Sequence, residues 1–502
     1  MVNDLIYCSP EEEGLKSEEI LRFLDSIDFN RRNIHSLMIV RHGKILFETY
    51  AKNFNKDYLH RIYSCSKTYV ALAVGKLVME GLVSVNDRIL KYFPEYDEDC
   101  VSENLKNLTI RQMLVMATPY IDTLYCTHPD YVNFSCDKNN WSEKFLKPQT
   151  SESYRKPGYF EKPAGCSFLY DTGSPQVLGY LVYKLTGKQP TEYLRPIFDE
   201  IGVGEVKCVK APEGVEAMGT GVLTTLRDFA KVGEFIMHKG NVNGKQVLPL
   251  DYMTDFISPL IANDFGANFV PSDNCGYGYQ TWIHPNGFSL QGMRGQFVFA
   301  FPDKDFMVVQ NANIEGDGGI CEHATNLYKS LEDKPLKTGR AYVKLKKREK
   351  SFEVKPLYGN AYDKIEETIS QKRYFLDEND MGIRWIQLDF RKQCGTFKYY
   401  KDGEIKSIKF GRLKGVEIEF PEKHEIGFEI GESYNKGYRT FASASWGANK
   451  HLHLLCDIED IHIGYLCFNF DFKDDAVVLK VNRVCEFMLE TYHGYAIGKL
   501  QK

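Results

Sequence analysis

The chain has 502 residues, of which 43% are hydrophobic and 26% charged, a composition typical of a globular protein with several domains. The net charge of −5 excludes a strongly basic nucleic-acid surface as the main function, so no nucleic-acid partner is expected. No apolar run approaches the roughly 18 residues that a membrane helix needs, and the first residues show no pattern of a secretory signal. We therefore expect no membrane partner, a cytoplasmic location and reduced thiols on the 13 cysteines.

The first part of the chain mixes strand and helix patterns. Two apolar runs in residues 35–50 surround His42-Gly43 and predict a hairpin. Apolar side chains at helical spacing predict helices over 67–81 and 172–187. Three strands are expected near the end of this part, over 276–285, 287–292 and 295–313. Because strands lie at both ends and helices lie between them, we predict one sheet built from both ends of the domain.

Residues 341–502 have a different character and predict a second, mainly β domain after a first domain of residues 1–340. The junction, residues 340–356, is rich in lysine and predicts a solvated linker or an edge strand. Strand patterns follow over 383–390, 395–410, 415–420, 451–458 and 464–472. Residues 401–403 (Lys-Asp-Gly) are typical of a hairpin turn, and an amphipathic pattern predicts a final helix near 483–492. A small barrel or a sandwich is the expected architecture, and its role is open.

The sharpest local motif is Ser-x-x-Lys at Ser64 and Lys67. Three residues along a helix bring the two side chains to one face, where a lysine whose pKa is lowered by burial can accept the serine proton. The same spacing starts at Ser64, Ser135, Ser153 and Ser433. Only Ser64 opens a long apolar helix that would carry its lysine into a core. The alternative is an ordinary helix-capping serine beside a surface lysine.

The residues that follow this motif resemble a known family. The helix after Ser64 is followed by Glu-Gly-Leu at 80–82, Asn-Asp at 86–87 and Lys-Tyr-Phe-Pro-Glu at 91–95. This order resembles the serine β-lactamase and penicillin-binding-protein superfamily, most closely its branch of esterases and 6-aminohexanoate-dimer hydrolases related to class C β-lactamases. The resemblance covers roughly residues 5–335. It implies an α/β fold of the α+β type, with an antiparallel sheet flanked by helices and a helical lobe.

The second motif of this branch, Tyr-x-Asn, corresponds to Tyr170-Asp171-Thr172. The resemblance implies that Tyr170 shuttles a proton between the serine oxygen and the leaving group. A core tyrosine is the alternative, since the chain has 31 tyrosines. Thr172 stands where the family has asparagine and is expected near the substrate. Its hydroxyl cannot make both of the hydrogen bonds that an amide makes across the same span.

The third motif, Lys-Thr-Gly in β-lactamases, corresponds to Met293-Arg294-Gly295, and Gln296 follows it. The resemblance implies that the backbone N–H groups of Ser64 and Gln296 form an oxyanion hole. Arg294 and Gly295 are expected near the substrate, where the arginine would suit an amide that bears a carboxylate. The absence of the Lys-Thr pair argues against β-lactams as natural substrates.

No metal site or cofactor is expected. The candidate ligands are Cys126, His128 and Cys136 in one segment and His451, His453 and His462 in another. The spacing of the first set matches no zinc pattern, and strand alternation places His451 and His453 on one exposed sheet face. No phosphate-binding loop or dinucleotide motif is present. Thr224 and Asp228 are expected to start a helix.

These motifs together predict a serine hydrolase that cleaves a small ester or amide through an acyl-enzyme on Ser64. Lys67 is the expected base and Tyr170 the proton relay. A D-amino-acid peptidase or penicillin-binding-type enzyme is one alternative, and a non-catalytic binding or scaffold protein that keeps the fold is another. The natural substrate and the oligomeric state stay open.

Overall fold

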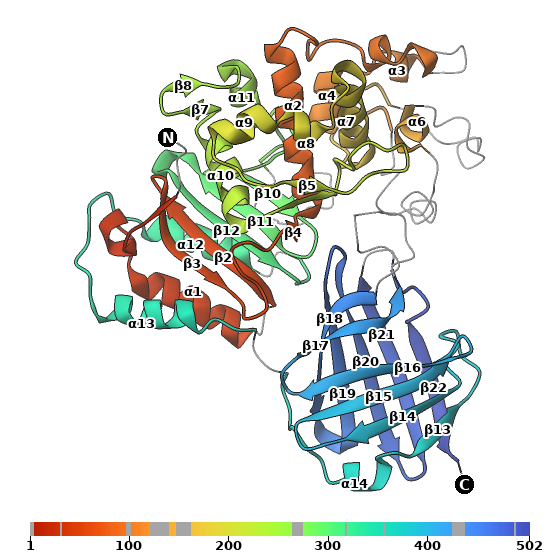
Figure 1. The fold of residues 1–502 in the computed structure, drawn as a ribbon. Helices are drawn as coiled ribbons and strands as arrows, with labels where there is room; N and C mark the ends of the chain where they lie inside the picture. Colours follow the sequence, from red (N-terminus) through yellow and green to blue (C-terminus); the bar gives the residue numbers. More distant parts are fainter. Residues whose placement is uncertain are drawn as a thin grey trace. The chain divides into compact units, whose positions relative to one another are not determined.

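The chain folds into two compact units, Met1–Val354 and Lys355–Lys502. The computed structural model describes residues 5–30, 33–96, 102–120, 140–146, 162–263, 275–316, 319–354, 357–423, 437–485 and 488–501. Figure 1 shows the first unit in red through green to teal, and most strands of the second unit in shades of blue. Within these ranges no helix combines the length and the apolar character needed to cross a bilayer.

A seven-stranded sheet forms the centre of the first unit. The predicted hairpin is confirmed: β2 (Ile34–Arg41) and β3 (Lys44–Tyr50) are antiparallel. Their turn residues His42 and Gly43 have positive φ angles of 48° and 69°, which is the pattern of a type I′ turn. β2 also pairs antiparallel with β12 (Phe306–Ala312), so both ends of the unit contribute to one sheet, as predicted.

The strand order of this sheet is β1-β3-β2-β12-β11-β10-β9. Its other strands are β1 (Ile6–Tyr7), β9 (Trp282–His284), β10 (Gly287–Gly292) and β11 (Gln296–Phe301). The segment 295–313, predicted as one strand in the series, contains both β11 and β12. Pro302 and the left-handed Asp305, with φ 45°, turn the chain between them.

Helices cover both faces of the sheet, because its strands are apolar on both sides (Figure 1). On one face, α1 (Ser17–Phe29) and α12 (Ile320–Ser330) pack on a shared core. That core includes Leu37, Ile39, Phe297, Phe299 and Val308. On the other face lies α10 (Leu226–Met237), where a Cβ on Gly233 would meet Val298 at 3.0 Å. The glycine therefore lets this helix approach the sheet closely.

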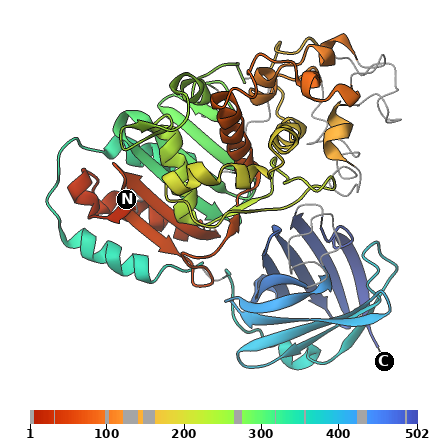
Figure 2. The ribbon, with the colours of Figure 1, turned by 45° about the horizontal axis from the view of Figure 1, so that its top comes forward.

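The basic segment 340–356 is neither a linker nor an edge strand, as the sequence had suggested, but begins with a helix, α13 (Arg340–Lys350). Ala341 and Leu345, one helical turn apart, are buried, while the lysines point outward. α13 packs beside α1 (Figures 1 and 2) and so belongs to the first unit. The division between the units therefore falls after Val354 rather than near residue 340.

The helical lobe contains both of the predicted long helices. α2 (Ser66–Met79) and α7 (Gly173–Thr186) pack against each other and correspond to the predictions over 67–81 and 172–187. The shorter helices of the first unit are α3 (Glu103–Lys106), α4 (Ile110–Leu114), α6 (Trp141–Leu146), α8 (Pro190–Tyr193), α9 (Arg195–Glu200) and α11 (Leu250–Phe256). The first unit also has two small sheets. One contains β4 (His60–Arg61), β5 (Lys207–Cys208) and β6 (Val222–Thr224), and the other contains β7 (Asn241–Val242) and β8 (Lys245–Gln246).

The second unit is a ten-stranded, barrel-like β domain that also contains the short helix α14 (Glu366–Ile369). Its strands are β13 (Arg373–Leu376), β14 (Trp385–Phe390), β15 (Cys394–Lys401), β16 (Glu404–Arg412), β17 (Val416–Lys423), β18 (Gly437–Trp446), β19 (His451–Glu459), β20 (Ile463–Lys473), β21 (Ala476–Cys485) and β22 (Gly494–Leu500). A parallel pairing of β16 with β18 links strands near the two ends of the sheet. Figure 2 shows the strands curving around a common interior.

The β character of this unit is confirmed, and Asp402 and Gly403 form the predicted left-handed turn between β15 and β16. The predicted helix near 483–492 is wrong, because residues 483–485 continue strand β21 and the described residues 488–492 form bends and turns. Val477, Leu479 and Val481 of that strand are fully buried at alternate positions, which is the period of a strand.

Candidate active site

Ser64 is the one residue between His60 and Leu77 that is not buried. It lies in a 3₁₀ turn, Tyr63–Cys65, that leads directly into α2. Tyr63 before it has a φ of 48°, a conformation that is costly for an aromatic residue. Strained residues of this kind are concentrated at functional sites. The chain therefore presents a single hydroxyl at the surface of an otherwise buried segment.

Lys67 is the nearest basic group to this hydroxyl. Its Nζ lies 3.0 Å from the Oγ of Ser64 and donates a second hydrogen bond, of 2.7 Å, to the carbonyl oxygen of Gly219. The side chain is 1% exposed, as the apolar helix predicted. A buried ammonium needs polar partners, and these two oxygens supply them. The geometry suits transfer of the serine proton to lysine.

Tyr170 reaches the same place from the loop before α7. The Nζ of Lys67 lies 5.0 Å from the centre of the Tyr170 ring. The Tyr170 ring also stacks on Trp282, with ring centres 5.4 Å apart and an interplanar angle of 29°. Tyr170 is half-buried and packs against a small core cluster that includes Trp282. The first two motifs therefore come together in space.

Asp171, next to this tyrosine, was not singled out from the sequence. Burial raises the pKa of its carboxyl to about 6, although hydrogen bonds from Ser174 and the charge of Lys67 act in the opposite direction. The N–H and hydroxyl of Ser174 donate bonds of 2.6 and 2.8 Å to this carboxyl. These bonds fix the start of α7, and with it the loop that carries Tyr170. An Asp three residues before a Ser at a helix start is a recognisable signal of such a cap.

The turn between β10 and β11 places the third motif against the serine segment. A Cβ on Gly292 would lie 2.3 Å from the carbonyl oxygen of Ile62, so only glycine fits there. The Sγ of Cys65 donates to the carbonyl oxygen of Gln296 at 3.4 Å. The side chain of Gln296 is itself held by Ala312, through a bond of 2.7 Å. The backbone of Gln296 is thus held beside the Ser64 turn.

Arg294 and Gly295 have positive φ angles of 67° and 93° and make the turn itself. The Arg294 guanidinium is 8% exposed and donates two bonds, of 2.9 and 2.6 Å, to Oδ1 of Asn313. A Cβ on Gly295 would lie 2.6 Å from Ile314. Both residues therefore shape the turn, whereas the neighbouring Met293 is 42% exposed.

Thr172 lies beside Gly219, the residue whose carbonyl oxygen accepts a hydrogen bond from Lys67. A Cβ on Gly219 would come within 2.4 Å of the Thr172 methyl carbon, so the two residues are in close contact.

The helix-start prediction is right for Asp228 and wrong for Thr224. Thr225 caps α10, with its hydroxyl accepting from the N–H of Asp228 at 3.1 Å, because Thr224 is the last residue of β6.

Several sequence candidates fall outside the described residues. They are Ser135, Ser153 and Ser433, and Cys126, His128 and Cys136. Among the residues that are described, no group of three or more His, Cys, Asp or Glu side chains could hold a metal ion. His451 and His453 pair across strands with Asp471 and Asn469, each at 2.7 Å, as expected of a sheet face.

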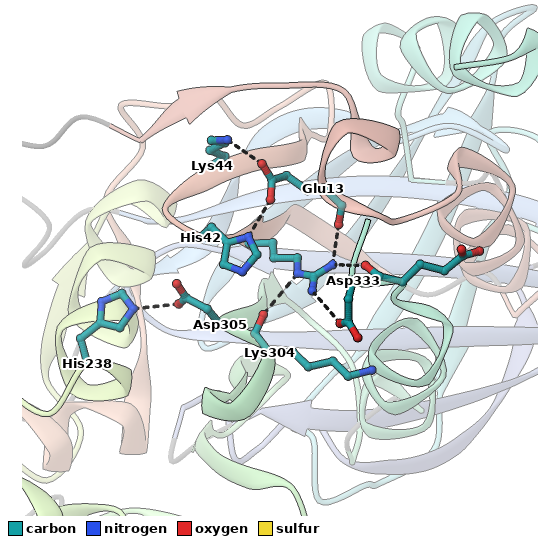
Figure 3. Close-up of polar contacts among 9 residues, drawn as sticks. Glu13, His42, Lys44, His238, Lys304, Asp305 and Asp333 are labelled. Carbon is teal, nitrogen blue, oxygen red and sulfur yellow. Dashed lines mark hydrogen bonds and ion pairs between the residues drawn. The ribbon is translucent and has the colours of Figure 1, made fainter. Parts of the chain in front are cut away.

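A separate polar cleft of about 740 Å³ lies at the β2–β3 turn and the end of α10. Its lining includes His42, Lys44, Glu234, His238 and Asp305 and none of the motif residues. Figure 3 shows the contacts beside it: Glu13 accepts from His42 and Lys44, and His238 pairs with Asp305. Because all three sequence motifs lie around Ser64 and none lines this cleft, the Ser64 group remains the candidate active site.

The family model described as Beta-lactamase matches residues 31–328, more than half of the chain. The chain belongs to the Beta-lactamase family. The matched stretch contains all three motifs, which confirms the resemblance drawn from them. The 6-aminohexanoate-dimer hydrolase of Paenarthrobacter ureafaciens is 21% identical over 292 residues, covering 55% of this chain and 71% of that protein. Protein flp of Staphylococcus aureus (strain MW2) is 25% identical over 175 residues, covering 32% and 31% of the two chains.

Two solved structures share the fold of the Beta-lactamase part. A candidate β-lactamase from Bacteroides dorei DSM 17855 has a TM-score of 0.51 and 16% identity, covering 63% of this chain and 99% of its own. EstCE1, a hydrolase with promiscuous acyltransferase activity, has a TM-score of 0.50 and 12% identity, covering 62% and 98%. The fold prediction for the first domain is therefore confirmed. The similar proteins include two that are named as hydrolases.

Proposed function

We propose that this protein is a serine hydrolase that cleaves a small ester or amide through an acyl-enzyme on Ser64. The observation that carries the proposal is the 3.0 Å contact between Lys67 Nζ and the Oγ of Ser64, the one accessible residue of its segment. A serine beside a buried base is the arrangement that activates a hydroxyl for attack. The hydrolases among the relatives support the same reaction class.

In the proposed reaction, Ser64 Oγ attacks the substrate carbonyl carbon while its proton passes to Lys67. The oxyanion that forms accepts hydrogen bonds from the backbone N–H groups of Ser64 and Gln296. Tyr170 donates a proton to the departing alcohol or amine, and the bond to the leaving group breaks. Tyr170 then takes a proton from water, which attacks the acyl carbon. As the bond to Ser64 breaks, Lys67 returns its proton to Ser64 Oγ, which releases the acid and regenerates both the serine and the base. No metal or organic cofactor enters these steps.

The substrate proposal stays at the level of small esters and amides. Met293, where β-lactamases have the motif lysine, has no charge to pair with the carboxylate of a β-lactam. The buried Arg294 is held by Asn313, so its contribution to a carboxylate-bearing substrate is through the shape of the turn. If the protein were a penicillin-binding-type enzyme, β-lactams would acylate it. If it were a non-catalytic binding protein, it would not turn over esters.

Pre-steady-state kinetics test this proposal. With p-nitrophenyl acetate and an acyl p-nitroanilide, we expect a burst of product equal to the enzyme concentration, followed by steady turnover. Ser64→Ala removes both phases, whereas Ser351→Ala, at an exposed serine on the end of α13, is a matched control that keeps them. Turnover of both substrates by Ser64→Ala at the parent rate would contradict the proposal.

A further inference from the structure

We infer that Thr172 and Gly219 form a positioning pair that holds the carbonyl acceptor of Lys67. This inference rests on the proposed function of Ser64 and Lys67. Thr172 stands where the family motif has asparagine, and its contribution is packing rather than an amide hydrogen bond. Gly219 supplies the oxygen that Lys67 binds at 2.7 Å, and Thr172 fixes where that oxygen lies.

The two residues lie so close together that no room is left for a side chain at Gly219. A Cβ added to Gly219 would lie 2.4 Å from the Thr172 methyl carbon and 3.0 Å from the Thr172 carbonyl oxygen. Contacts shorter than about 3 Å between such atoms are repulsive, so any side chain at Gly219 must displace the chain. The methyl group of Thr172 occupies the space that a side chain at Gly219 would need.

The same segment is tied to the serine turn at two further points. Arg61, which is 1% exposed, donates from Nε to the carbonyl oxygen of Thr220 at 2.9 Å and from Nη2 to its hydroxyl at 3.0 Å. The N–H of Val222 donates to the hydroxyl of Ser66 at 2.9 Å. Residues 219–222 are therefore hydrogen-bonded to the chain on both sides of Ser64, at Arg61 and at Ser66. Thr172, at the start of α7, packs against the first residue of this segment, Gly219.

A displaced Gly219 carbonyl has a defined chemical consequence. Lys67 would lose the acceptor that orients its Nζ toward Ser64, and misplacement by about 1 Å can cost roughly 100-fold in rate. The substrate does not touch this carbonyl in the proposed mechanism, so KM is expected to change little.

The central test is rescue of Gly219→Ala by Thr172→Ser, which removes the methyl group in contact. We expect Gly219→Ala to lower kcat for p-nitrophenyl butyrate by about 100-fold with KM within about threefold, and the double variant to recover at least about tenfold. Gly339→Ala is the matched control, because a Cβ there meets nothing within 4 Å and its φ of −125° suits any residue.

A second pair of variants covers the case in which Gly219→Ala does not fold. Thr172→Val keeps the methyl contact and loses the hydroxyl, whereas Thr172→Ser does the reverse, and we expect kcat to be higher in Thr172→Val. The opposite order would overturn the inference, as would a folded Gly219→Ala with the parent kcat or a double variant without recovery. Full activity of Ser64→Ala would instead overturn the proposed function, so the two failures are distinguishable.

Discussion

The Nδ1 atom of His35, on strand β2, lies 2.8 Å from the Nε2 atom of His60, on strand β4, and both rings are buried. Nδ1 of His60 pairs with the carbonyl oxygen of Arg61 at 3.0 Å. Phe54 stacks on His35, with ring centres 4.1 Å apart. The imidazole pair thus links the central sheet to the segment that leads into Ser64.

This pair predicts loss of stability in mild acid. Burial, together with the adjacent His35, lowers the pKa of His60 to about 3, whereas the unfolded value is about 6.5. Between these values the unfolded chain binds a proton that the folded chain does not, so the free energy of unfolding falls as the pH falls. We expect the decrease in melting temperature from pH 7 to pH 5 to be smaller in His60→Gln than in the parent. His493→Gln, at an exposed histidine, is the control. An unchanged pH dependence in His60→Gln would contradict this account.

The ion pair of His238 and Asp305, 2.8 Å apart beside the polar cleft, predicts a window of pH stability (Figure 3). The hydrogen bond that His238 donates to Asp305 raises the pKa of the imidazole despite burial. Burial opposes ionisation of Asp305, but the bond and charge of His238 outweigh it and lower that pKa. The stabilisation is lost as the pH rises through the folded pKa of His238, and also as it falls through that of Asp305.

A double-mutant cycle of His238→Gln and Asp305→Asn measures this interaction. Because both side chains are partly exposed, we expect a coupling of about 0.2–1 kcal/mol at pH 6. The coupling should shrink at pH 9, where the imidazole is neutral. Equal coupling at both pH values would mean that the histidine charge makes no contribution.

Removal of either proton-transfer group should slow acylation. We expect Lys67→Ala and Tyr170→Phe each to lower the acylation rate of an amide by at least about 100-fold, the usual scale for lost proton transfer. Lys329→Ala and Tyr495→Phe, at exposed positions, are the matched controls. Stopped-flow measurement with an activated ester and with an amide is needed, because an activated leaving group requires little protonation. Near-normal turnover of both substrates by Tyr170→Phe would remove that residue from the mechanism.

The two units have separate cores, so the catalytic groups should function without the second unit. The core of the second unit runs from Ile369 to Ala496, and a core of the first unit ends at Phe352. We expect a chain truncated after Val354 to keep its helical circular dichroism and its reactivity at Ser64. A truncated chain that folds but no longer turns over ester would show that the C-terminal domain contributes to the site.

Local patterns in the sequence were enough to predict the hairpin at His42-Gly43 and helix α2, because turn chemistry and apolar spacing act within a few residues. The placement of Ser64 and Lys67 followed from the same helix. Gly219 could not be found in this way, since its role depends on a carbonyl that meets Lys67 from a distant loop. The helix α13 was missed because its lysines concealed the helical spacing of Ala341 and Leu345.

The identity of the nucleophile is the central claim, and one measurement tests it most directly. The intact protein is treated with a fluorophosphonate probe, digested, and analysed by tandem mass spectrometry. We expect one adduct, on the hydroxyl of Ser64, and no labelling in Ser64→Ala, because the serine and its base act as one unit. An adduct on Ser135, Ser153 or Ser433 in the parent protein, with Ser64 unmodified, would contradict the account.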